Sequence, residues 1–200
     1  MIVFKLIRKI INSVLNFIYT PVTKIIFVLN GVKINKGLVA FGIPKIIVTR
    51  RGNVKFGVNL MINSGQNHNI IGRNQKTIFW VEGKLTIGDN VGMSSTAIIC
   101  NHEIEIGDNV MIGGNTVIYD TNFHSLDPKK RQDKHLDRKN TKYGKVTIKN
   151  NVFIGAHTTI LKGVTIDENS IIGACSVVSK DIPKNEVWAG NPAQFIRKIN

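Results

Sequence analysis

The sequence has little cysteine, little proline and, over its first 81 residues, no acidic side chain. Two cysteines among 200 residues, Cys100 and Cys175, cannot build a disulfide framework, and they form neither a CxxC motif nor a Cys/His cluster with metal spacing. A reducing, cytoplasmic setting is therefore favoured. Five prolines and 42% hydrophobic residues argue against a disordered chain, and the length allows one main domain with a substantial core.

The missing acidic residues make the charge distribution uneven. Residues 1–81 carry 12 of the 27 lysines and arginines and no aspartate or glutamate before Glu82, whereas the rest of the chain is nearly balanced. This asymmetry indicates an acidic partner, either a membrane surface or a nucleic acid. Aromatic residues interleaved with basic ones in a groove-reading pattern are absent, which disfavours a nucleic acid. A non-enzymatic basic binding module stays as an alternative.

Residues 2–19 show hydrophobic residues at spacings of three and four with basic and polar residues on the other side. This pattern predicts an amphipathic helix within an N-terminal segment, residues 1–31, that precedes the main domain, residues 32–200. A spanning helix is disfavoured by Asn12, Asn16, Pro21 and Lys24, and no signal-peptide cleavage site follows. Two roles remain open: peripheral contact with the inner face of a membrane, or packing on the same domain or a neighbouring subunit.

A period of six residues organises the carboxyl-terminal part of the chain. The aliphatic residues that carry it are Ile148, Ile154, Ile160, Ile166, Ile172 and Val178. An α-helix cannot keep every sixth residue on one face, and an amphipathic strand has a period of two. The pattern therefore predicts an all-β solenoid with three six-residue sides and an 18-residue coil, with Asn151 and Asn169 near corners.

The same period is present earlier with lower fidelity. Ile87, Met93 and Ile99 are followed by Ile106 after a slip of one residue, which predicts a bulge at one corner. The segment from Val32 to Lys76 is looser still. Between Ile118 and Val146 the period stops, and a polar stretch of this length inside a solenoid is expected to leave the coil as a loop, over about residues 120–146.

These hexapeptides resemble the left-handed parallel β-helix of the hexapeptide-repeat acyltransferases over roughly residues 32–200. The start of the predicted loop, with Asp120, Asn122, His124 and Asp127, is similar to the D-x-x-x-H-x-x-D signature of that family's acetyltransferases. The resemblance implies direct acetyl transfer from acetyl-CoA to a sugar hydroxyl in surface polysaccharide biosynthesis, with no metal. His124 is then the general base and Asp120 the carboxylate beside it, while Asn101 and Asn122 contact the acceptor.

The stretch from Phe153 onward resembles the family's consensus for binding acetyl-CoA. Its elements are an aromatic residue before I-G, a G-A-G-S-like element, an S-K-D-I-P turn and G-N-P-A. The donor residues that the resemblance implies are Ala156, Ala174, Ser179, Lys180 and Arg197. Two departures are Phe153, where the family most often has Trp, and Cys175, which replaces a glycine at a corner expected to be left-handed.

The resemblance also implies a homotrimer with active sites between subunits. N-acetylation of an amino sugar is the nearest alternative activity. A zinc-dependent, carbonic-anhydrase-like hydratase is another, for which His102 and His124 are candidate ligands and a third ligand is not evident.

Overall fold

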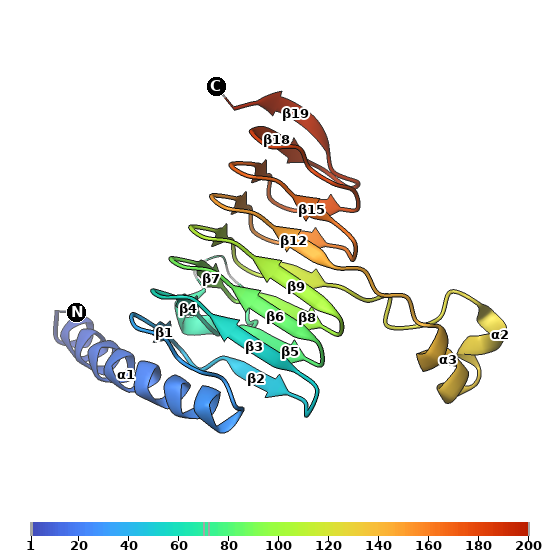
Figure 1. The fold of residues 1–200 in the computed structure, drawn as a ribbon. Coiled ribbons are helices and arrows are strands. Elements are labelled where there is room, and N and C mark those ends of the chain that lie inside the picture. Colours follow the sequence, from blue (N-terminus) through green and yellow to red (C-terminus); the bar gives the residue numbers. More distant parts are fainter. Residues whose placement is uncertain (1, 70, 72, 200) are drawn as a thin grey trace.

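The computed structural model describes residues 2–69, 71 and 73–199, with the side chain of Ile2 excepted. The chain forms a three-sided parallel β-helix with a long helix at its N-terminal end and a loop that projects from its side (Figure 1). Each side is a mainly parallel sheet, and successive strands move from one sheet to the next, so that three strands complete one coil. The predicted solenoid is confirmed.

Each of the first five coils contributes one strand to each side of the solenoid. In spatial order, the first sheet contains β1 (Val39–Phe41), β4 (Met61–Asn63), β7 (Gly92–Ser94), β10 (Met111–Ile112), β13 (Phe153–Ile154), β16 (Ile171–Ile172), β18 (Glu186–Ala189) and β19 (Gln194–Lys198). The second contains β17 (Val177–Val178), β14 (Thr159–Ile160), β11 (Val117–Tyr119), β8 (Ala97–Cys100), β5 (Ile78–Val81) and β2 (Lys45–Val48). The third contains β15 (Thr165–Ile166), β12 (Val146–Ile148), β9 (Glu103–Ile106), β6 (Lys84–Ile87) and β3 (Asn53–Phe56).

The inward aliphatic residues stack from coil to coil in the predicted register. Ile148 pairs with Ile166 and Ile154 with Ile172, both 18 positions apart. All four side chains are fully buried. Each such isoleucine contributes about 1.5–3 kcal/mol by burial, so the repeat itself supplies the core.

The register of the middle coils differs from the expected one. Ile98, rather than Ile99, is fully buried and stacks on Phe79 and Ile118, whereas Ile99 points outward and is half-buried. The prediction that Ile99 continues the inward row is therefore wrong. The extra residues are accommodated at the corner after β8, where Asn101 and His102 link the second sheet to the third.

A ladder of asparagines lines the corner between the third and first sheets. Each amide donates to the next coil, from Asn59 through Asn90, Asn109, Asn151 and Asn169 to Asn185, at 2.8–3.2 Å. All six residues have positive φ, between 56° and 60°. Asparagine tolerates this left-handed conformation better than other non-glycine residues, and its side-chain amide forms hydrogen bonds with the asparagines of the adjacent coils. Both properties explain why asparagine recurs at this corner.

The two ends of the solenoid are covered differently. Helix α1 (Ile2–Leu29) runs ten residues beyond the predicted 2–19 period and packs through Phe27 against Phe56 and Phe79, with ring centroids 5.4 and 5.9 Å apart. At the other end, β19 pairs antiparallel with β18, and Trp188 is almost fully buried. The connection between β4 and β5, residues 64–77, carries the 3-10 turn η1 (Gln66–His68).

The asparagine ladder yields a stability prediction. Asn151→Gly removes two ladder hydrogen bonds, whereas Asn151→Ala removes the same bonds and also places a side chain unsuited to φ +60° at the corner. We expect Asn151→Ala to lower the free energy of unfolding by about 1 kcal/mol more than Asn151→Gly. Denaturant unfolding at one protein concentration measures the difference. Equal losses would show that backbone conformation does not limit this corner.

Candidate functional site

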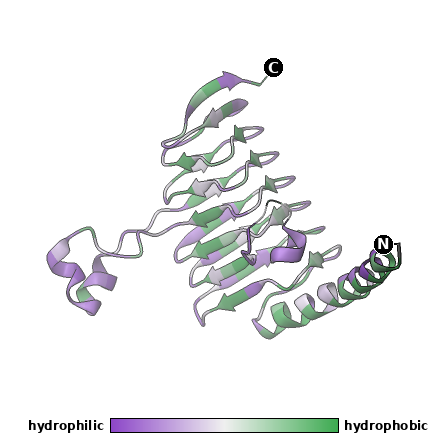
Figure 2. Ribbon diagram, turned by 180° about the vertical axis from the view of Figure 1, so that it is seen from behind, coloured by the Kyte–Doolittle hydropathy of each residue, from purple (hydrophilic) through white to green (hydrophobic). Residues whose placement is uncertain are grey.

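The loop predicted at about residues 120–146 leaves the solenoid between β11 and β12. It carries two short helices, α2 (Pro128–Arg131) and α3 (Lys134–Asn140), and stands away from the three sheets (Figures 1 and 2). Its two ends run antiparallel at the root, where Thr121 bridges Tyr143 and the Gly144 amide donates to the Asp120 carbonyl at 2.9 Å. These contacts at the root fix the direction in which the loop leaves the solenoid.

His124 lies just beyond the root, and its imidazole is paired with a carboxylate. Nδ1 is 2.7 Å from Oδ2 of Asp137, whose other oxygen accepts the Ser125 amide at 2.7 Å. Asp137 comes from α3, which is N-capped by Asp133. The His124 side chain is 69% exposed, whereas Asp137 is 15% exposed. The carboxylate is thus packed within the loop while the imidazole faces outward.

This pairing determines what the imidazole can do. With the Nδ1 hydrogen donated to Asp137, Nε2 remains as the hydrogen-bond acceptor on the exposed side. The hydrogen bond from His124, aided by the Ser125 amide, lowers the pKa of Asp137 below its ordinary value. The carboxylate therefore stays ionised at neutral pH and is placed to stabilise a protonated imidazole.

The expectation that Asp120 is the carboxylate beside His124 is wrong, because Asp137 occupies that position. Asp120 is fully buried under the corner after β8, where its two oxygens accept the amides of Asn101 and His102 at 2.8 and 2.7 Å. Burial raises its pKa. Asp120 therefore accepts the hydrogen bonds of the additional backbone amides at that corner. Asp137, thirteen residues after His124, was missed because its approach depends on how α3 folds back.

The two predicted acceptor residues are near the root of the loop. Asn101 occupies the corner that Asp120 supports, and its buried Oδ1 has no hydrogen-bond partner among the described residues. The Asn122 amide donates to the Lys142 carbonyl across the root, and its own carbonyl accepts the His124 amide. Both therefore lie on the same edge of the second sheet as the loop.

The predicted donor residues divide between the two edges of the second sheet. Ala156 and Ala174 stack in successive coils at the corner before it, where the Cys175 amide donates to the Ala156 carbonyl at 2.8 Å. Among the described residues, the amides of Ala156 and Ala174 donate to no other group. Cys175 has a φ of +59°, so the predicted left-handed corner is confirmed and is occupied by a residue with a side chain.

Ser179 and Lys180 follow β17, on the edge of the second sheet from which the loop departs. Both are exposed, and the Lys180 ammonium lies 4.9 Å from the centre of the Trp188 ring. Arg197, in β19, is also exposed. The two cations therefore lie toward the carboxyl-terminal end of the solenoid, where they can meet an anionic group.

In the part of the chain that the structure describes, no group of three or more His, Cys, Asp or Glu side chains is arranged to hold a metal ion. His102 is exposed at its corner, and its amide is held by Asp120.

Residues 145–180 match the model of the bacterial transferase hexapeptide family, described as six repeats. The galactoside O-acetyltransferase of Escherichia coli is 42% identical over 132 residues, which cover 60% of this chain and 61% of that protein. The matching segment therefore spans less than two thirds of this curated relative.

Two solved structures are similar in fold and sequence. A maltose O-acetyltransferase from Clostridium difficile is 30% identical, with a TM-score of 0.52, over 82% of this chain and 71% of that one. A hexapeptide-repeat-containing acetyltransferase from Vibrio cholerae is 32% identical, with a TM-score of 0.53, over 58% of this chain and 63% of that one.

The lowered pKa of Asp137 yields a pH prediction. The ion pair with His124 is fully present at pH values above the ordinary pKa of an aspartate. It is lost as the pH falls through the lower pKa that Asp137 has in the folded protein. His124→Ala removes the main cause of the shift, so we expect the midpoint of Asp137 to rise toward its ordinary value. A carbon-13 NMR titration of the Asp137 carboxyl group in both proteins measures it, and an unchanged midpoint would contradict the pairing.

Proposed function

This chain belongs to the hexapeptide-repeat acyltransferases, whose left-handed parallel β-helix it shares, and we propose that it transfers an acetyl group from acetyl-CoA to a hydroxyl group of a sugar. The observation that carries the proposal is the exposed imidazole of His124 held through Nδ1 by Asp137. A general base needs a free nitrogen and a fixed tautomer, and this pair supplies both.

The reaction follows from the orientation of this pair. Nε2 of His124 accepts the proton of the sugar hydroxyl as its oxygen attacks the thioester carbonyl, and the Asp137 carboxylate stabilises the resulting imidazolium. The new carbon–oxygen bond forms, the carbon–sulfur bond breaks, and the proton passes from His124 to the departing thiolate. No acyl-enzyme forms in this sequence.

We assign the binding site of the acetyl donor to the corner between the first and second sheets, where Ala156 and Ala174 stack in successive coils. The free amide of Ala156 would donate to the carbonyl oxygen as negative charge develops on it, with Ala174 one coil further on. Ser179, Lys180 and Arg197 would receive the polar and phosphate parts of coenzyme A. A structure of the similar Vibrio cholerae protein was solved with acetyl coenzyme A, which supports this donor.

A homotrimer is part of the proposal. The His124 loop stands away from its own solenoid (Figure 1). Ala156 and Ala174 precede β14 and β17, so they lie on the opposite edge of the second sheet. This division supports an active site in which the imidazole of one subunit meets the donor corner of its neighbour.

The acceptor is proposed from the named relatives. Galactoside and maltose O-acetyltransferases support a sugar hydroxyl as acceptor. The family resemblance motivates the further proposal that the reaction serves surface polysaccharide biosynthesis on the cytoplasmic side of the membrane. Asn101, whose buried Oδ1 has no partner in the described part of the chain, would orient that hydroxyl from the edge where the loop begins.

His124→Ala tests the base. We expect kcat to fall by about 10²–10⁴-fold because proton removal is lost, while binding of acetyl-CoA changes little. Thiol release from acetyl-CoA, measured across a panel of sugars and amino sugars, reports the rate and separates O- from N-acetylation. His135→Ala, an exposed histidine of the same loop, is the control. Normal turnover by the His124 variant would exclude this mechanism.

Two aspartate variants separate the catalytic carboxylate from the structural one. Asp137→Asn keeps the size of the side chain but loses its charge, so we expect kcat to fall at least tenfold with little change in Tm. Asp120→Asn disturbs a buried acceptor of two amides, so we expect Tm to fall first. The assay and thermal unfolding are run on both variants. A rate loss confined to Asp120→Asn, with Tm unchanged, would reverse the assignment.

A further inference from the structure

Helix α1 has two faces that are used differently. One face packs on the solenoid through Asn16, Thr20, Thr23 and Phe27, which follow one another at spacings of three and four. The Thr20 hydroxyl accepts the Ala40 amide at 3.0 Å, which fixes the rotation of the helix against the first coil. The helix therefore presents a defined opposite face to its surroundings.

That opposite face is apolar along its whole length. Counted at 100° per residue, its residues lie about 90–210° around the helix from the centre of those that pack on the solenoid. They are Val3, Ile7, Ile10, Ile11, Val14, Phe17, Ile18, Ile25, Val28 and Leu29, with exposed fractions from 43% to 83%. At 1.5 Å per residue, the 28-residue helix carries this stripe for about 42 Å.

A continuous apolar surface of this size marks an interaction site. By length and composition alone, the segment Val3–Leu29 could also cross a membrane. However, the packed residues Thr23 and Phe27 belong to the same turns as the exposed Ile25 and Val28, so the carboxyl-terminal half cannot cross a bilayer while it is docked on the solenoid. The stripe can instead lie flat against a surface, with the solenoid on its other side (Figure 2).

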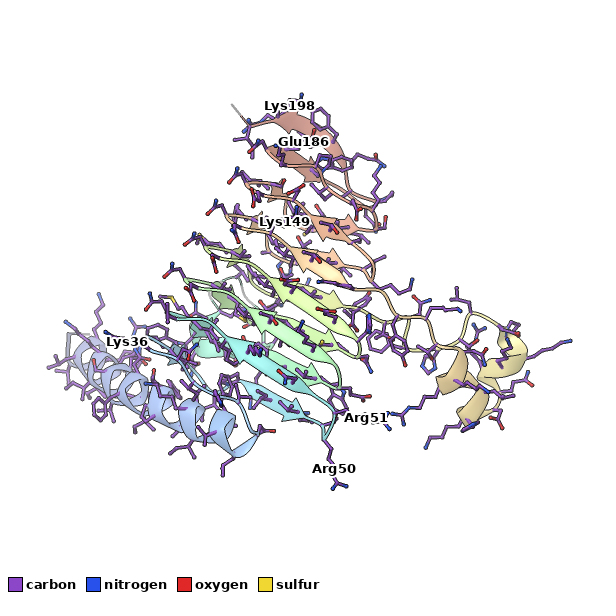
Figure 3. All side chains as sticks on the ribbon, in the orientation of Figure 1. Lys36, Arg50, Arg51, Lys149, Glu186 and Lys198 are labelled. Carbon is purple, nitrogen blue, oxygen red and sulfur yellow. The ribbon has the colours of Figure 1, made fainter. Side chains whose placement is uncertain are left out.

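The charge around the stripe indicates which kind of surface the stripe contacts. Lys5, Arg8 and Lys9 are exposed on the polar face of the helix, from which long basic side chains can extend to lipid headgroups, and residues 1–81 contain no acidic side chain. Figure 3 shows Arg50 and Arg51 at the end of the solenoid where α1 lies, and neither forms an ion pair with another described residue. A second copy of the same basic region would repel this one, whereas an anionic lipid surface is complementary to both the charge and the apolar stripe.

We propose that α1 docks the solenoid on an anionic membrane surface, with the helix in the plane of the interface. The stripe enters the boundary between headgroups and acyl chains, and the basic residues of α1 and of the Arg50–Arg51 corner meet the headgroups. Docking in this manner requires neither acetyl-CoA nor an acceptor, so it is separable from the proposed reaction.

Vesicle sedimentation of the full chain tests the proposal. We expect binding to vesicles of equimolar phosphatidylcholine and phosphatidylglycerol, and at least tenfold weaker binding to phosphatidylcholine alone. The triple variant Lys5→Gln, Arg8→Gln, Lys9→Gln should lose at least tenfold in binding to the mixed vesicles. Its matched control, Lys129→Gln, Lys134→Gln, Lys139→Gln, removes the same charge from the exposed loop and should bind as the unaltered protein does.

A second pair of variants tests the apolar stripe. Val14→Asp with Phe17→Asp places charges in the stripe, and we expect binding to mixed vesicles to be lost. Met111→Asp, an exposed apolar residue of the solenoid, is the control and should bind normally. Circular dichroism and light scattering, applied to each variant, establish that fold and oligomeric state are unchanged.

Three results would overturn the proposal. The first is equal binding to neutral and anionic vesicles, or equal losses in the two triple variants. The second is a change of oligomeric state in the stripe variant together with no vesicle binding by the unaltered protein, which would make a second copy the partner of the stripe. The third is retention in native membranes after alkaline carbonate extraction, which would indicate a spanning helix.

Discussion

The stacking of equivalent residues in successive coils is the constraint on which the rest of this structure depends. Ile154 meets Ile172 across 18 positions because each of the three sides between them is six residues long, and each corner must turn the chain within a few residues. Left-handed backbone at Asn151 and Cys175 shows how the corners meet that requirement. Where the residues between two sides change in number, as after β8, a buried carboxylate is needed to satisfy the additional amides.

The same constraint explains why the proposed chemistry is located in a loop. A regular coil presents rows of backbone groups and short side chains, which suit the binding of an extended ligand, whereas an oriented acid–base pair needs two side chains held against each other. The excursion between β11 and β12 provides one, because α3 folds back and brings Asp137 to His124. The solenoid in turn holds the root of that loop through Asp120 and Gly144.

The two ends of the molecule have different surfaces. At the carboxyl-terminal end, Trp188 and the β18–β19 pair close the core, and Lys180 lies beside them. At the N-terminal end, α1 closes the core with one face and leaves an apolar stripe on the other. The basic excess of residues 1–81 is therefore concentrated around the end that we propose meets a membrane, while the loop that carries His124 emerges from the side.

The sequence by itself determined the repeat, the loop and the helix, because each depends on local spacing: six residues for a coil, a long break for the loop, three and four for α1. It also singled out His124 as a candidate, through the resemblance of its surroundings to a family motif. Tertiary structure decided which carboxylate meets that histidine, since Asp120 and Asp137 are both near it in the chain and only folding of α3 separates their roles. It likewise decided that Ile98 points inward in place of Ile99, because pairing between strands sets the register that a slipped repeat leaves open.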